Sequence, residues 1–289
     1  MVNELSEAVS GEGETTPAEI GEWFALSSGV VMLVAERPDG RIAAYSDMVD
    51  AALDHLRFWI DLRVPPQEDR AELAAALLEA MEGRAAEEAA PGATVRVSIF
   101  AGDEGTRVSV ETAGYEVFRH SFRMQIDFEG DLPTPEWPEG ITVRTIVRGQ
   151  DDHTVWEAHQ DAFADGFEHA TWPYESWREW AFSEAFDPSL WFLAVDGDDI
   201  AGVCLCKAHA GAEGELGWVN VLGVRREWRR RGIARALLLN AFAEFRARGS
   251  SGAGLGVDGL NPTGAVALYE QAGMHVARRL DQYKKPLTA

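Results

Sequence analysis

Six arginines lie close together in a chain that is otherwise strongly acidic. The chain carries 26 basic and 48 acidic residues, a net charge of −22, yet the stretch 225–235 is basic and contains Gly232 just before an apolar run with helical spacing. A helix N-terminus offers unpaired N–H groups and partial positive charge, and glycine lets an anion approach the backbone closely. The stretch therefore predicts a pyrophosphate-binding loop rather than a solvated basic helix start. The candidate residues are Arg225, Arg226, Arg229, Arg230, Arg231, Gly232, Ile233, Ala234 and Arg235.

A central strand and a long helix must hold this loop in place. Residues 216–224 form a near-continuous apolar run, typical of a strand that is covered on both faces. Residues 234–245 carry apolar side chains at the spacing of one buried helical stripe, and Gly249 is the expected end of that helix. Further strands are predicted at 141–145, 190–195, 200–208, 252–257, 274–277 and around Tyr283, and further helices at 151–163, 174–182 and from Asn261, as cap, with Pro262 to Gly273. This alternation predicts an α/β (α+β) domain with a mixed sheet flanked by helices.

Three patterns between Val221 and Gly273 resemble the signature of the GNAT N-acetyltransferase family. They are Val221-Leu222-Gly223-Val224, then Arg229-x-x-Gly232-x-Ala234, then Asn261 with Leu268-Tyr269-Glu270-x-x-Gly273. The resemblance implies acetyl-CoA as co-substrate and no metal. In the family, the strand that matches Leu222, Gly223 and Val224 bonds the pantetheine arm, and the loop that matches Arg229 to Arg235 holds the pyrophosphate through main-chain N–H groups. Ala234 stands where glycine is common in the family.

The same resemblance assigns the proton transfers. Tyr269 matches the tyrosine that protonates the departing thiolate in many members, and a phenol of pKa about 10 suits that task. The alternative is a core aromatic, because Tyr269 shares helical phase with Val266. Glu215, at the start of the central strand, is the candidate general base. A water relayed by backbone carbonyls or by Asn220 is an equal alternative, and an exposed residue at a strand edge is a further one.

An aromatic and mildly acidic stretch, 166–180, is the predicted acceptor-binding segment. It could receive a cationic amine or a flat apolar group, although ordinary packing of a Trp-rich helix would explain it as well. The candidates are Glu168, His169, Trp172, Tyr174 and Trp177, together with Trp218, which occupies the strand position where family members often carry a carboxylate. The histidines, including His153 and His159, show no metal-ligand spacing with Cys, Asp or Glu, so no metal is predicted.

The first half of the chain repeats the same plan without its chemistry. Eight residues past the strand end at Val224 comes Gly232, whereas eight residues past Val64 comes Glu72, with acids and prolines between. We therefore expect two tandem GNAT-like domains, the first degenerate, a layout that resembles the mycothiol synthase family. That family carries a glutamate near the position of Trp218, so its absence here indicates another acceptor. The expected division is a flexible tail at 1–20, the degenerate domain at 21–130, a proline-rich linker at 131–140 and the catalytic domain at 141–289.

Composition narrows the class of protein. The acidity argues against nucleic-acid or anionic-membrane partners, and neither a signal peptide nor a membrane-spanning run is evident. Cys204 and Cys206 lie in an apolar run and are expected to be reduced core residues. We expect a cytoplasmic enzyme, monomer or homodimer, that moves an acetyl group to a primary amine of a small molecule by direct attack. The alternatives are a protein lysine or N-terminal acetyltransferase and a non-catalytic acyl-CoA-binding sensor.

Overall fold

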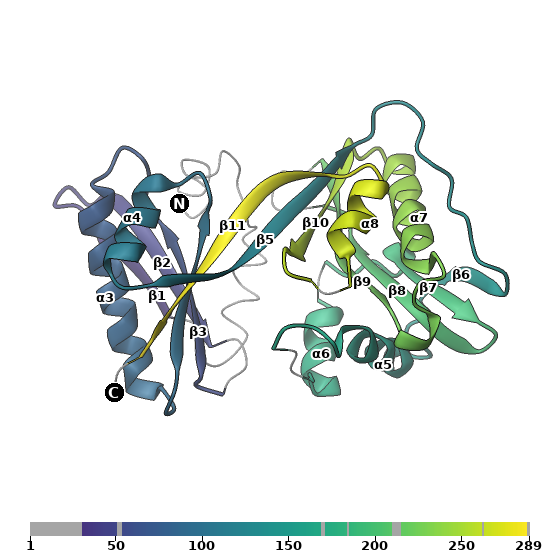
Figure 1. Ribbon diagram of the computed structural model, residues 1–289, viewed down its shortest axis with the longest axis horizontal. Helices are drawn as coiled ribbons and strands as arrows, with labels where there is room; N and C mark the ends of the chain where they lie inside the picture. Colours follow the sequence, from purple (N-terminus) through teal and green to yellow (C-terminus); the bar gives the residue numbers. More distant parts are fainter. Residues whose placement is uncertain are drawn as a thin grey trace. The chain divides into compact units, whose positions relative to one another are not determined.

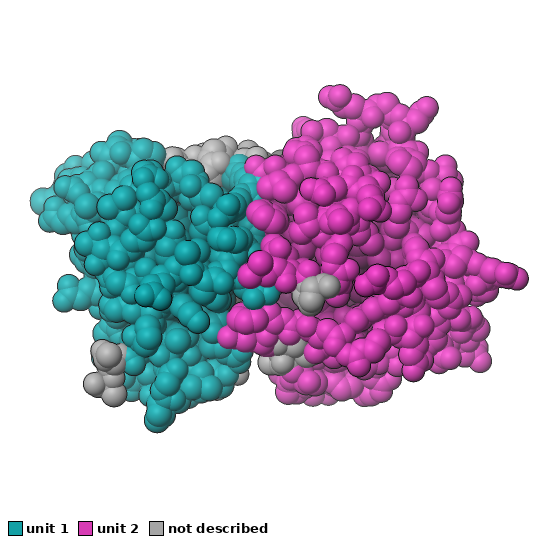
Figure 2. Space-filling model, viewed as in Figure 1, with its two compact units in different colours: residues 1–121, 278–289 teal, residues 122–277 magenta. Residues whose placement is uncertain are grey.

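The chain forms two compact units whose boundaries fall inside two long strands. The computed structural model describes residues 31–50, 54–168, 171–183, 185–209, 215–261 and 263–287. Unit 1 comprises Met1–Ser121 with Arg278–Ala289, and unit 2 comprises Phe122–Ala277 (Figure 2). Strands β5 (Glu116–Asp127) and β11 (His275–Pro286), each of 12 residues, therefore contribute to both units.

This division differs from the one predicted from the prolines. Residues 131–140 do lose strand periodicity, but they connect β5 to β6 inside unit 2. The predicted separate runs near 274–277 and Tyr283 are one continuous strand, β11, and its residues from Arg278 onward belong to unit 1. The predicted tail 1–20 and the start of the first domain lie outside the described residues.

Unit 2 is a mixed sheet with helices on both faces, as the alternation of elements predicted (Figure 1). The strand order is β5-β10-β9-β8-β7-β6, with β9 and β10 parallel and the pairs from β9 through β6 antiparallel. The strands are β6 (Ile141–Thr145), β7 (Trp191–Asp196), β8 (Asp199–Lys207), β9 (Leu216–Val224) and β10 (Gly252–Asp258). The helices are α5 (Asp152–Phe163), α6 (Tyr174–Ala181), α7 (Ile233–Ala247) and α8 (Ala265–Gln271), with short turns of 3₁₀ helix at η1 (Pro188–Leu190) and η2 (Arg226–Trp228).

Alternation along β8 separates the two cores of unit 2. Cys204 and Cys206 belong to the cluster formed with α7, whereas Leu205 belongs to the cluster formed with α5 and α6. Both thiols are buried, as expected for reduced core residues. Each fully buried large apolar side chain of these clusters, such as Phe242 of α7, stabilises the fold by ~1.5–3 kcal/mol.

Unit 1 has a similar sheet, in the order β1-β2-β3-β4-β11, with β3 and β4 parallel. Its elements are β1 (Val31–Glu36), β2 (Ile42–Asp50), β3 (Arg57–Arg63), α3 (Arg70–Glu88), β4 (Thr94–Phe100) and α4 (Glu104–Thr112). The helix that follows β3 begins under its own acidic cap, because the Asp69 carboxylate accepts a hydrogen bond from the Glu72 N–H at 3.1 Å. The helix start that corresponds to the basic loop of unit 2 is thus closed by a carboxylate.

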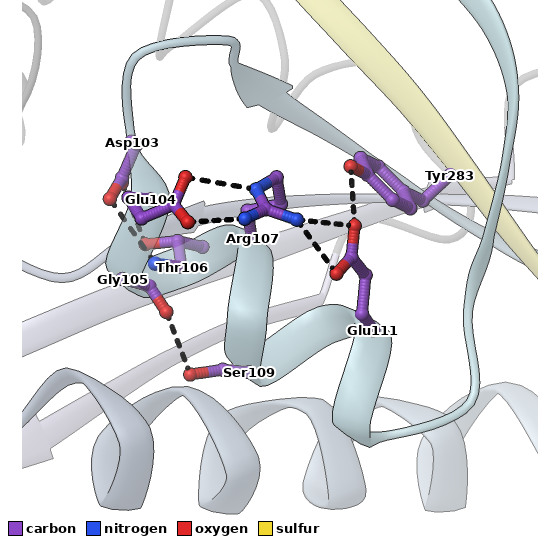
Figure 3. A network of polar contacts seen from close by, with 8 residues as sticks. All are labelled: Asp103, Glu104, Gly105, Thr106, Arg107, Ser109, Glu111 and Tyr283. Carbon is purple, nitrogen blue, oxygen red and sulfur yellow. Dashed lines mark hydrogen bonds and ion pairs between the residues drawn. The ribbon is translucent and has the colours of Figure 1, made fainter.

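A polar network fastens the end of β11 within unit 1 (Figure 3). Arg107 of α4 binds both carboxylate oxygens of Glu111, at 2.8 and 2.9 Å, and also pairs with Glu104. Glu111 in turn accepts a hydrogen bond from the hydroxyl of Tyr283 on β11 at 3.2 Å. Burial, followed by the nearby Glu111 charge, raises the pKa of Tyr283, so the phenol stays a donor.

One helix start was predicted wrongly. α8 begins at Ala265 after Gly264, which has a φ of 77°, and Asn261 is not its cap. The Asn261 side chain instead accepts the N–H of Thr263 at 2.8 Å, a local turn that precedes the helix. Pro262 lies outside the described residues. No helix within the described ranges is both long and apolar enough to cross a membrane.

Candidate active site

Strands β9 and β10 separate halfway along β9 and leave an open edge. Their parallel register runs from Leu216 opposite Gly252 to Val219 opposite Leu255, and β9 then continues to Val224 paired only with β8. A register shift between Leu205 and Cys206 on β8 leaves Asn220 as the extra residue of a bulge. Residues 220–224, here called the open edge of β9, therefore have backbone groups available to an extended ligand, as a sheet edge does for a peptide. Leu222, Gly223 and Val224 all lie on it.

The open edge leads into residues 229–235, here called the cofactor loop. Arg230 has a φ of 63° and Gly232 a φ of 87°, so the chain turns sharply before α7 begins at Ile233. No side chain caps this helix, and a Cβ built on Gly232 would meet no atom within 4 Å. In the described part of the chain, the N–H groups of Arg230 to Ala234 donate no hydrogen bond. The result is a set of unpaired donors at a helix N-terminus beside open space, which is the donor set that a phosphate group requires.

Four of the six arginine side chains bind protein groups, and two do not, within the described residues. Those of Arg225, Arg226 and Arg229 pair with Asp161 and Asp165 at the end of α5. Arg231 lies 3.6 Å from Asp196 and donates to the Glu139 carbonyl at 3.2 Å. Within the described ranges, only Arg230 and Arg235 of the six lack a protein partner. The predicted concentration of free positive charge is therefore smaller than the sequence implies, and the loop depends mainly on its backbone.

Tyr269 of α8 lies beside the strand pair that carries the open edge. It is 7% exposed and belongs to the same buried cluster as Cys204 and Leu237. Burial, followed by the Cys204 thiol, raises the pKa of Tyr269 to about 12. Leu222, which pairs with Cys204 across β8 and β9, packs against the same cluster, and the raised pKa keeps the Tyr269 phenol protonated at neutral pH. The position of Tyr269 is compatible both with a packing role in the core and with a role as general acid.

Glu215 lies too far from this point to serve there as a base. It is exposed and precedes β9, where its carbonyl accepts the Ser251 N–H at 3.0 Å. Glu215 stands seven positions before Leu222, a separation of about 23 Å along an extended strand. The geometry instead favours the alternative of a water relayed at the bulge, where Asn220 is exposed.

The predicted acceptor segment is partly core and partly surface. Trp177 is 0% exposed and donates from its indole to His159 Nδ1 at 2.8 Å, so it is a packing residue. Trp172 is 39% exposed, with its ring 5.5 Å from that of Trp180 in an edge-on contact. Glu168 is exposed with a φ of 49°, and His169 lies outside the described residues.

Trp218 and Tyr174 are both half-buried, but they lie in different surroundings. Trp218 of β9 is half-buried beneath the guanidinium of Arg123, at 5.2 Å. Tyr174 is half-buried in the cluster of α5 and α6, in ring contact with Trp156 and Trp177. Trp218 thus stands on β9 just before the bulge, whereas Tyr174 fixes the start of α6.

Comparisons with known proteins identify the family. Residues 153–274 match the acetyltransferase (GNAT) family. The chain is 39% identical over 158 residues to a mycothiol acetyltransferase of Thermobispora bispora, an alignment that covers 54% of this chain and 53% of that relative. It is 34% identical over 218 residues to one of Geodermatophilus obscurus, covering 74% of this chain and 69% of the relative. This chain belongs to the GNAT acetyltransferase family.

Solved GNAT structures have the same overall fold. A GCN5-related N-acetyltransferase from Sphaerobacter thermophilus matches with a TM-score of 0.83 and 33% identity, covering 100% of this chain and 91% of the other. A tandem GNAT protein from the clavulanic acid biosynthesis pathway matches with a TM-score of 0.72 at 16% identity, covering 99% and 94%, which supports the tandem fold. With the first curated relatives the chain aligns over little more than half of their length, 53% to 59%.

A small pocket of this GNAT domain was not foreseen from the sequence. Its lining includes Trp180, Phe186, Trp191, Leu205, Lys207 and Asn220. The one available signal was Lys207, a charge that ends the apolar run of β8. Asn220 lines this pocket and also belongs to the open edge of β9. In the described segments no group of His, Cys, Asp or Glu side chains forms a metal site.

Proposed function

We propose that this chain is an N-acetyltransferase that uses acetyl-CoA to acetylate a primary amine of a small molecule. The observation that carries the proposal is the continuity between the open edge of β9 and the uncapped N-terminus of α7. An extended pantetheine arm fits the first feature, and a pyrophosphate fits the second. Acetyl-CoA supplies the thioester whose acetyl group is transferred.

The residues of the chain have distinct tasks in this reaction. Backbone N–H groups of the open edge, around Leu222, are placed to stabilise negative charge on an acyl oxygen. Tyr269 holds a proton where a thiolate would leave, since its pKa of about 12 keeps the phenol protonated at neutral pH. The backbone and the exposed Asn220 at the bulge are placed to hold a water that takes the proton from the attacking amine.

The pocket beside Asn220 is lined by the rings of Trp180, Phe186 and Trp191 and has room for about one water molecule, so its size does not select an acceptor. The curated relatives are named for mycothiol, which supports a small-molecule acceptor in this chain as well. Trp218 stands where the mycothiol synthase family has a glutamate, so we propose an acceptor different from that of the relatives.

Calorimetric titration with acetyl-CoA tests the binding site. We expect one binding event in the wild type and none in Gly232→Glu, because the added carboxylate would face the pyrophosphate. Retained affinity in Gly232→Glu would refute the assignment of the loop. A thiol-release screen over small amines, amino acids, aminoglycosides and cysteinyl sugars then tests transfer. Binding without thiol release for any amine would indicate a sensor rather than an enzyme.

A further inference from the structure

The Arg229 guanidinium joins the end of the open edge of β9 to the end of α5. Its Nε donates to the Val224 carbonyl at 3.0 Å, at the end of the open edge. Its Nη2 donates to the Ala162 carbonyl at 3.0 Å, in the last turn of α5, and its Nη1 lies 2.7 Å from the Asp165 carboxylate. These three acceptors are protein groups, so the guanidinium is held in place before any ligand arrives.

The surrounding contacts strengthen the same connection. Asp165 also pairs with Arg226, and Asp161 one turn earlier pairs with Arg225 at 2.7 Å. Hydrogen bonds from Arg229 and then Arg226 hold the pKa of Asp165 below its usual value, so the carboxylate stays charged. The end of α5 is thus joined to residues 225–229 by ion pairs as well as by the hydrogen bond from the Arg229 side chain to the Ala162 carbonyl.

Gly223 permits the close approach on which this arrangement depends. A Cβ at Gly223 would lie 2.7 Å from the Ala162 Cβ and 2.9 Å from the Phe163 ring. The last turn of α5 therefore packs directly against the open edge of β9. The residues that follow, 164–168, are exposed and lead along the chain into the predicted acceptor segment 166–180.

We propose that Arg229 and Asp165 are positioning residues that couple the cofactor loop to segment 164–168. Resting on the proposed function, the inference is that CoA held by the loop N–H groups also fixes the segment that receives the acceptor. Arginine suits this task because its planar fork donates in several fixed directions at once, which a lysine ammonium cannot reproduce. Arg229 therefore acts through the protein and does not touch the phosphates.

Hydrogen–deuterium exchange of the full chain, with and without saturating CoA, tests the coupling without a known acceptor. In the wild type we expect CoA to slow exchange in the peptide that covers 161–168. In Asp165→Asn and Arg229→Lys this CoA-dependent slowing should be lost, while CoA affinity falls by no more than about fivefold, because exposed ion pairs contribute little. Asp165→Glu should restore part of it. Glu175→Gln, which removes one partner of an exposed pair on α6, is the matched control and should behave as wild type.

The outcomes separate the coupling from the proposed function. Slowed exchange that persists in Asp165→Asn would overturn the coupling and leave acetyl transfer standing. CoA affinity lost in Arg229→Lys as completely as in Gly232→Glu would also overturn it, by making Arg229 a phosphate ligand. A wild type that does not bind CoA at all would overturn the proposed function itself, and the coupling with it.

Discussion

Leu222 of β9 lies directly opposite Cys204 of β8, and the Cys204 thiol is one of the two causes that raise the pKa of Tyr269. Three elements, β8, β9 and α8, therefore meet at one point of the sheet. In this GNAT domain that point is the middle of the open edge, where the acyl group of acetyl-CoA is expected. This relationship supports the proposal that Tyr269 is the general acid.

Tyr269→Phe should lower kcat by about 100-fold, the low end for loss of a general acid, while acetyl-CoA affinity stays the same. The phenol pKa of about 12 means that wild-type activity should show no decline from Tyr269 deprotonation between pH 7 and about 10. Rates of thiol release across that range, with calorimetry for binding, check both statements. An unchanged kcat would leave Tyr269 as a core aromatic only.

Glu215→Gln should leave kcat and its pH dependence unchanged. The side chain is exposed and about 23 Å along the strand from Leu222, too far for proton transfer. The measurement is the same thiol-release assay, with Asn220→Ala beside it, which should slow transfer if the bulge holds the relaying water. A large loss of kcat in Glu215→Gln, with none in Asn220→Ala, would indicate that Glu215 is the general base.

Gly223→Ala should destabilise the protein by ~1–3 kcal/mol, because its Cβ would lie 2.7 Å from that of Ala162. Removing the opposing methyl group in Gly223→Ala with Ala162→Gly should recover part of the loss, less the cost of a helical glycine. Urea unfolding of the single and double variants measures this. Equal stability of Gly223→Ala and wild type would show that α5 can move away from β9 freely.

Asp47 of unit 1 should make stability depend on pH. Burial, followed by the Asp61 carboxylate opposite on β3, raises its pKa to about 6, and Tyr45 donates to it at 2.5 Å. A raised carboxyl pKa means that protonated Asp47 is favoured in the folded state. Its contribution to the free energy of unfolding is therefore fully present below about pH 4 and is lost as pH rises through 6. Asp47→Asn keeps an acceptor for Tyr45 and should be more stable than wild type at pH 7, by ~1–3 kcal/mol.

Urea unfolding at pH 4 and pH 7 checks this expectation. The difference in unfolding free energy between the variant and the wild type should be larger at pH 7 than at pH 4. An identical difference at the two pH values would mean that the pKa of Asp47 is the same in the folded and the unfolded chain.

Local sequence patterns predicted the elements that carry the site, because their cues are local. The apolar run 216–224 is β9 to the residue, and the helical stripe from Ala234 lies on α7. The partners of the arginines could not be predicted in this way. Asp165 stands 64 positions before Arg229, and only the fold brings the end of α5 beside the loop.

The errors also have local physical causes. Asparagine is a common residue type at helix N-caps, but the Asn261 side chain accepts a hydrogen bond from the Thr263 N–H, and the helix starts after Gly264. Glu215 was chosen as base by residue type, and its distance along β9 from Leu222 favours the alternative of a relayed water. The boundary at 131–140 was inferred from prolines, which mark loss of strand structure but not the limit of a compact unit.

The division of β11 has a consequence for how the protein is made. Residues Leu280 to Pro286 pair with β4, so they complete the sheet of unit 1. The ribosome produces them only after all of unit 2 has been synthesised, because translation runs from the N-terminus. Throughout that interval the growing polypeptide carries β4 with this edge unpaired, an edge of the kind that recruits other chains. Until Leu280–Pro286 leave the ribosome, the edge of β4 that they cover is therefore a site where another chain could add a strand.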